Sequence, residues 1–98
     1  MLSEIVYTET YKFTLAALIK NVESFYGHAF AEKLLDRIDL IVEKIVVNPF
    51  MFQAIPIDPK FRRVVISRQS SLVYEVAETK IILLYIFDNR QDPLWTDF

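Results

Sequence analysis

The hydrophobic pattern of this chain changes at Asn48-Pro49, and that change restricts the folds that are open to it. Before the proline, apolar residues recur at steps of three and four, which is the spacing of one helix face. After it, they form short alternating or continuous runs, which are typical of strands. Helices grouped ahead of most strands indicate an α+β fold. The chain has 98 residues, so we expect a single domain over residues 1–98.

Two helices joined by a very short turn are predicted before the proline. The first is expected over about residues 9–26 and the second over about 29–47, with Gly27 ending the first and Asn48-Pro49 ending the second. So short a connection makes the two helices an antiparallel hairpin. The apolar stripes consist of Tyr11, Leu15, Leu18, Val22 and Phe25 in the first helix and of Phe30, Leu34, Ile38, Ile41 and Ile45 in the second.

Four strands complete the prediction, one ahead of the helices and three after them. The run from Ile81 to Phe87 is apolar on both faces, which places that strand in the centre of the sheet. The turns between the last three strands are short enough to force antiparallel pairing. We therefore expect the order β-α-α-β-β-β, a small and mostly antiparallel sheet with the helical hairpin on one face. The strands are expected at residues 2–7, 61–67, 72–76 and 80–88.

Composition excludes several kinds of functional site. The chain has no cysteine and one glycine, so disulfides, Cys-ligated metals, Cys nucleophiles and glycine-rich phosphate loops are excluded. His28 is the single histidine; we interpret it as a surface residue and expect no metal and no cofactor. The longest apolar run is far below the roughly 20 residues of a membrane-spanning helix, and the first residues lack a signal-peptide pattern. We expect a cytoplasmic protein without membrane contact, and its net charge of −2 disfavours capture of nucleic acid by the whole molecule.

Basic residues gather between positions 60 and 68, a stretch without any acid. Guanidinium groups bind phosphate and carboxylate in a bidentate manner, so these residues are candidates for an anion site. A solvated, charge-protected edge strand is the alternative, and the charge run alone favours it. Strand alternation sends Arg62 and Arg63 to opposite faces of the sheet unless a bulge intervenes. The candidate anion-binding residues are Lys60, Arg62, Arg63, Arg68 and, after the last strand, Arg90, for which a simple turn residue is the alternative.

Two further features are open to a functional interpretation. Glu75 is a candidate general base, with a cross-strand ion pair as the favoured alternative. Aromatic residues in the proline-rich connection and near the end of the chain predict apolar surface that a partner covers, although the terminal ones could instead dock on the core. The predicted partner-binding residues are Phe50, Phe52, Leu94, Trp95 and Phe98.

The order of elements and three segments resemble the RelE/ParE superfamily of type II toxin–antitoxin toxins. The segments are residues 61–65 (FRRVV), 72–76 (LVYEV) and 82–93 (ILLYIFDNRQDP), and the resemblance covers about residues 2–93. It implies a small toxin that an antitoxin holds inactive. RelE-like members cut messenger RNA on the ribosome, whereas ParE-like members poison DNA gyrase.

Departures from the ribonuclease pattern favour the ParE-like activity. RelE-like members commonly carry an arginine just before the Val-Tyr pair, where this chain reads Ser71-Leu72, and His or Lys before the last arginine, where it has Asn89. Cleavage by the 2′-hydroxyl needs a proton acceptor and cationic stabilisation, and whether the chain is an enzyme stays open. If it is a ribonuclease, the candidate catalytic residues are Arg62, Arg63, Arg68, Arg90 and Glu75.

We therefore expect a toxin that an antitoxin neutralises and that acts on DNA gyrase, as in plasmid-stabilisation systems. A RelE-like, ribosome-dependent mRNA endonuclease is the alternative, and a non-toxic domain that only binds its antitoxin is the second alternative. The expected partners are accordingly an antitoxin protein and either gyrase or the ribosome with its mRNA. A second copy of the chain is a further candidate partner.

Overall fold

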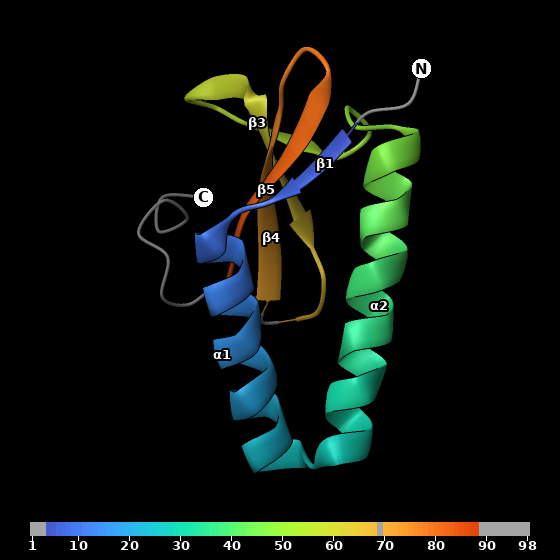
Figure 1. Ribbon diagram of the computed structural model, residues 1–98, viewed down its shortest axis with the longest axis vertical. Coiled ribbons are helices and arrows are strands. Elements are labelled where there is room, and N and C mark those ends of the chain that lie inside the picture. Colours follow the sequence, from blue (N-terminus) through green and yellow to red (C-terminus); the bar gives the residue numbers. More distant parts are fainter. Residues whose placement is uncertain (1–3, 69, 89–98) are drawn as a thin grey trace.

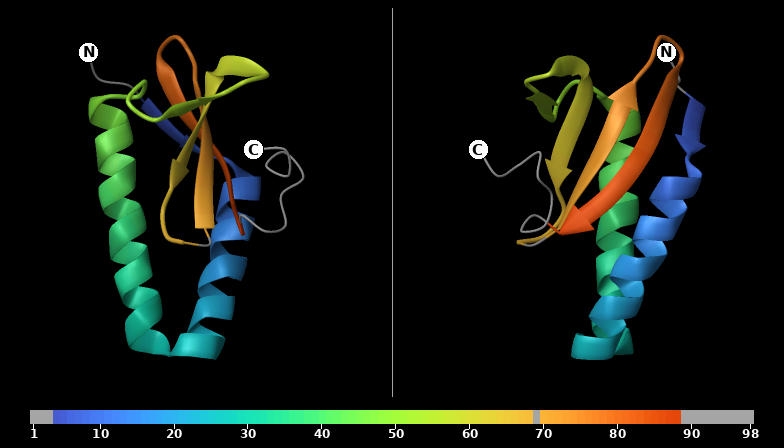
Figure 2. Two further views of the ribbon diagram at one scale, coloured as in Figure 1. Left: turned by 180° about the vertical axis from the view of Figure 1, so that it is seen from behind. Right: turned by 90° about the vertical axis from the view of Figure 1, so that its left-hand side faces the viewer.

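The computed structural model describes residues 4–68 and 70–88, and this part of the chain contains two helices packed on one face of a five-stranded sheet (Figure 1). The helices form a V that is closed at the end where they join and holds the sheet toward its open end (Figure 1, Figure 2). In chain order the elements are β1 (Glu4–Tyr7), α1 (Glu9–Tyr26), α2 (His28–Val47), β2 (Gln53–Ile55), β3 (Asp58–Val65), β4 (Ser70–Val76) and β5 (Lys80–Asp88). The α+β fold and the helical hairpin are as predicted.

The sheet has the order β1-β5-β4-β3-β2, with β1 parallel to β5 and the other pairs antiparallel. Its mostly antiparallel character was predicted, but β2 was not. This strand has three residues and lies between prolines in the connection after α2, so it is too short to show alternation. The strand β5 is interior, as its two apolar faces predict, although β4 holds the middle position.

The core lies between the helices and the face of the sheet that they cover. Ile38 and Ile45 of α2 meet Leu72 and Tyr74 of β4 and Leu83 of β5, all almost fully buried. A smaller apolar cluster on the far face of the sheet includes Ile55 and Val73. In the described part of the chain, neither helix is long and apolar enough to cross a membrane.

Two threonines attach α1 to the edge of β5 where β1 has ended. Thr8 caps α1 by accepting a hydrogen bond from the Tyr11 backbone N–H at 3.0 Å, and its hydroxyl donates to the Leu83 carbonyl at 2.8 Å. Six residues later, the hydroxyl of Thr14 accepts from the Ile86 N–H at 3.0 Å. These side chains replace the missing strand partner, so α1 continues alongside the strand and extends past the sheet.

The predicted apolar stripes are correct along most of both helices but wrong where the helices join. Phe25 near the end of α1 and Phe30 near the start of α2 are 79% and 51% exposed. Both helices extend beyond the end of the sheet there (Figure 2), so no strand in the described part of the chain covers these rings. The chain turns between the helices at Gly27, whose φ of 94° and ψ of 167° are accessible almost only to glycine.

Candidate functional site

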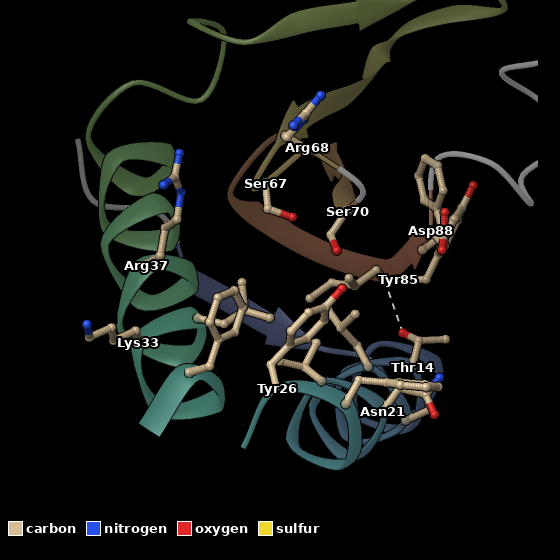
Figure 3. Close-up of a pocket in the computed structure, with 18 of the residues that line it drawn as sticks. Thr14, Asn21, Tyr26, Lys33, Arg37, Ser67, Arg68, Ser70, Tyr85 and Asp88 are labelled. Atoms are coloured by element: carbon tan, nitrogen blue, oxygen red, sulfur yellow. Dashed lines mark hydrogen bonds between the residues drawn. The ribbon is translucent and has the colours of Figure 1, made fainter. Parts of the chain in front are cut away.

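An open cavity of about 1270 Å³ lies between the joined ends of the helices and the adjacent end of the sheet (Figure 3). We call this cavity the groove. Its side chains come from α1, α2, the turn between β3 and β4, and the last residues of β5. The apolar residues among them are Phe13, Ala17, Leu18, Val22, Phe25, Tyr26, Phe30, Leu34, Tyr85, Ile86 and Phe87.

Four aromatic side chains give the groove an unusual amount of exposed apolar surface. Phe13, Phe25, Tyr26 and Phe30 are 75%, 79%, 63% and 51% exposed. Three of them are neighbours, with ring centroids 6.5 Å apart for Phe25 and Tyr26 and 5.0 Å apart for Tyr26 and Phe30. Contiguous exposed apolar surface of this kind marks an interaction site, because leaving it in water costs free energy that a partner recovers.

The charged rim of the groove is mainly basic. Lys33 and Arg37 of α2 and Arg68 of the turn after β3 stand around one side, and Asp88 at the end of β5 stands across from them (Figure 3). Among the described residues that line the groove, three side chains are thus cationic and one is anionic. The whole chain has a net charge of −2, so this rim is a local reversal that favours an acidic partner segment.

The structure separates the predicted anion-binding residues that it describes instead of bringing them together. Arg62 and Arg63 face opposite sides of β3, as strand alternation predicts, because Arg62 pairs with Tyr74 and Arg63 with Val73 in a regular register. Lys60 is exposed, with its ammonium group 5.1 Å from the centre of the Phe61 ring.

The guanidinium group of Arg62 holds the connection between α2 and β3. It donates to the carbonyl of Pro59 at 2.9 Å and to that of Phe52 at 3.1 Å, with a longer contact of 3.4 Å to Phe50. It also lies over the Phe50 ring, 4.9 Å from its centre. On the other face, Arg63 donates to the side-chain oxygen of Gln53 at 3.1 Å. Both arginines therefore make contacts that stabilise the β2–β3 end of the sheet.

The other predicted site residues fall in three places. Arg68 lies on the rim of the groove. Glu75 is half-buried on the face of the sheet that also carries Arg63, and its direct cross-strand neighbours are Phe61 and Ile82. The described residues provide no ion pair for Glu75, so the cross-strand pair that we favoured is not observed. Arg90 lies outside the described residues.

The predicted partner-binding residues that the structure describes do not line the groove. Phe50 and Phe52 lie in the connection after α2, where Phe50 packs under Arg62 and Phe52 against the core. Leu94, Trp95 and Phe98 are outside the described residues. Phe13 and Tyr26 were not among the predicted residues, because they fall off the apolar stripe of α1. Large aromatic side chains on the polar side of an amphipathic helix are the signal that could have identified them.

Comparison with known proteins supports this fold. The sequence matches no family model and no curated relative. Among solved structures, a chain of the chromosomal ParDE toxin–antitoxin system from P. aeruginosa aligns with a TM-score of 0.74 and 19% identity, over 89% of this chain and 96% of that one. A chain of the DinJ–YafQ toxin–antitoxin complex from E. coli aligns with a TM-score of 0.62 and 9% identity, over 92% of this chain and 96% of that one. A chain of the YoeB dimer from Staphylococcus aureus aligns with a TM-score of 0.59 and 13% identity, over 89% of this chain and 97% of that one. The chain thus has the RelE/ParE-like fold that its three segments predicted.

Proposed function

We propose that this chain, acting as one domain over residues 1–98, is the toxin of a type II toxin–antitoxin module. In this proposal the groove is the place where its antitoxin binds. The groove is the observation that carries the proposal, because it combines exposed aromatic rings with a basic rim at one end of the fold. The shared fold supports it, since two of the similar structures are toxin–antitoxin systems.

The shape and charge of the groove define the antitoxin segment that fits. Its floor is apolar and its walls are helical, which suits an amphipathic segment that inserts apolar residues along one face. The basic rim selects acidic residues on the flank of that segment, which would pair with Lys33, Arg37 and Arg68. We therefore expect an antitoxin whose toxin-binding segment alternates apolar anchors with Asp or Glu.

The proposed cellular target is DNA gyrase, as in ParE-like toxins. Ribonuclease chemistry needs cations and a proton acceptor held together around one phosphate. In the described part of the chain, Arg62 is bonded to backbone carbonyls, Arg63 and Glu75 face the far side of the sheet, and Arg68 lies on the groove. This dispersal supports a toxin that acts through binding rather than through RNA cleavage.

The antitoxin part is tested by binding to the product of the adjacent gene. Lys33→Glu/Arg37→Glu reverses two charges of the rim and should weaken the complex at least tenfold in calorimetric titration, with a smaller loss at high salt. Lys20→Glu/Lys44→Glu is the control, because it makes the same charge change at exposed helical positions outside the groove. Equal affinity of the rim variant and the control would contradict the groove as the binding site.

The target is tested by inducing the chain without antitoxin and following two readouts in the same culture. Gyrase-linked DNA breaks and loss of supercoiling are expected, with transcripts intact. Codon-positioned mRNA cuts with gyrase unaffected would instead make the chain a ribosome-dependent endonuclease. Neither effect, with antitoxin binding intact, would make it an antitoxin-binding domain without toxicity.

A further inference from the structure

A second cavity lies at the other end of the helical hairpin, where α1 begins, α2 ends and β1 runs across the open V (Figure 1). Its volume of about 440 Å³ falls within the range of about 300–1,000 Å³ that is typical of small-molecule sites. We call it the tyrosine pocket, because Tyr7 of β1 and Tyr11 of α1 both line it, with ring centroids 5.9 Å apart. Nothing in the proposed toxin function uses this pocket.

Tyr11 is a buried side chain whose hydroxyl lacks a hydrogen-bond partner in the described part of the chain. It is 3% exposed, yet none of the described residues forms a hydrogen bond with its hydroxyl. Burial, with smaller contributions from the nearby Tyr7 and Asp39, raises the pKa of Tyr11 to about 12. Both of these neighbours line the pocket, so the hydroxyl end of Tyr11 lies on the pocket side. The hydroxyl oxygen keeps contact with solvent, so it can form a hydrogen bond with a ligand atom that enters the pocket.

The pocket carries negative charge on one side. Asp39 and Glu43 stand one turn apart on α2 and both line it. Lys12 also lines the pocket, and its ammonium group is 3.3 Å from a carboxylate oxygen of the exposed Glu9. Two carboxylates against one ammonium group leave the lining net negative, which attracts a cation, and the two phenol rings add a cation–π contribution.

The remaining lining of the pocket is aliphatic. Ile5, Leu15, Val42 and Val46 provide branched hydrocarbon walls. Such walls suit a methylene chain, which gains free energy by leaving water while its charged end stays at the carboxylates. A metal ion does not fit this lining, and no metal-binding group of His, Asp and Glu is found among residues 4–68 and 70–88.

We propose that the tyrosine pocket binds a primary ammonium group carried on an unbranched aliphatic stem. The ammonium lies between Asp39 and Glu43 and donates a hydrogen bond to the Tyr11 hydroxyl, and the stem packs on the aliphatic walls. A free diamine and a lysine side chain both present this chemistry.

The test is a nuclear magnetic resonance titration of the full chain with three probes. The probes are 1,5-diaminopentane for a free diamine, Nα-acetyl-lysine methylamide for a lysine side chain, and 1-pentanol as the uncharged analogue. We expect saturable shifts of pocket amides with one or both amines and none with pentanol. Saturation by the diamine alone assigns a free amine as ligand, and saturation by the lysine derivative assigns a lysine side chain.

Variants locate the binding on the proposed residues. Asp39→Asn/Glu43→Gln should weaken amine binding about tenfold, since it removes both carboxylates. Tyr11→Phe keeps the ring and should weaken binding several-fold, with a thermal melt to verify folding. The control Glu32→Gln/Asp36→Asn makes the same charge change on α2 outside the pocket. The proposal is overturned if neither amine saturates, if pentanol binds equally, or if the control loses as much affinity as the pocket variant.

Discussion

Tyr74→Phe removes one oxygen atom from the middle strand of the sheet, and we expect it to loosen the junction between the helices and the strands. The Tyr74 ring is fully buried in β4, and its hydroxyl donates to the carbonyl of Pro49 at 2.6 Å. Pro49 lies just after α2, so this bond joins the end of the helical hairpin to the sheet. The phenylalanine ring fills the same space, which isolates the effect of the hydrogen bond.

The expected loss follows from this one interaction. A protein hydrogen bond contributes about 0.5–1.5 kcal/mol net, and a half-buried carbonyl that loses its donor adds to the cost, so unfolding should become easier by about 1–2 kcal/mol. The entropy of unfolding is about 2.1 cal/mol/K per residue, which for this chain length corresponds to about 0.2 kcal/mol/K. The melting temperature should therefore fall by about 5–10 °C.

Thermal unfolding followed by circular dichroism at neutral pH measures this change. Tyr26→Phe is the matched control, because it deletes the same oxygen from an exposed ring and should shift the melting temperature by less than about 2 °C. An unchanged melting temperature in Tyr74→Phe, or equal shifts in the two variants, would refute the role given to the Pro49 bond.

Three further predictions concern alkaline pH, Thr14 within α1 and Gly27 after it. Burial raises the pKa values of Tyr11 and Tyr74 to about 12, whereas in the unfolded chain they stay near 10. The two neutral hydroxyls therefore contribute fully to the stability of the fold below pH 10, and this contribution should be lost as the pH rises to 12. Urea unfolding from pH 9 to 12 checks this, and Tyr74→Phe should reduce the dependence of the unfolding free energy on pH. Thr14→Val removes the acceptor of the Ile86 N–H and should cost about 1–2 kcal/mol, with faster hydrogen exchange at that amide than at its β4 partners. Gly27→Ala meets no neighbouring atom but strains the backbone, and chemical denaturation should show a loss of about 1–3 kcal/mol. Unchanged stability in Gly27→Ala would indicate that the turn has a second accessible conformation.

The sequence alone determined the elements whose signals are local. The helices were predicted at about 9–26 and 29–47 and are found at Glu9–Tyr26 and His28–Val47, because periodicity, one glycine and one proline define both their faces and their ends. The strand Lys80–Asp88 was predicted with its bounds. The opposite orientations of Arg62 and Arg63 also followed from strand alternation, which needs no tertiary information.

Only the tertiary structure decided which apolar residues are covered and which charges meet. Phe25 belongs to the apolar stripe of α1 and Phe30 to that of α2, yet both are exposed, because burial there depends on how far the sheet extends beneath the helices. The basic charge run left an anion site and a charge-protected edge strand as alternatives, but Arg62 is hydrogen-bonded to carbonyls of the connection, while Arg68 and Arg37 both line the groove. Periodicity records only the two faces of one element, whereas the groove and the tyrosine pocket are formed by residues of several elements that are distant in the chain.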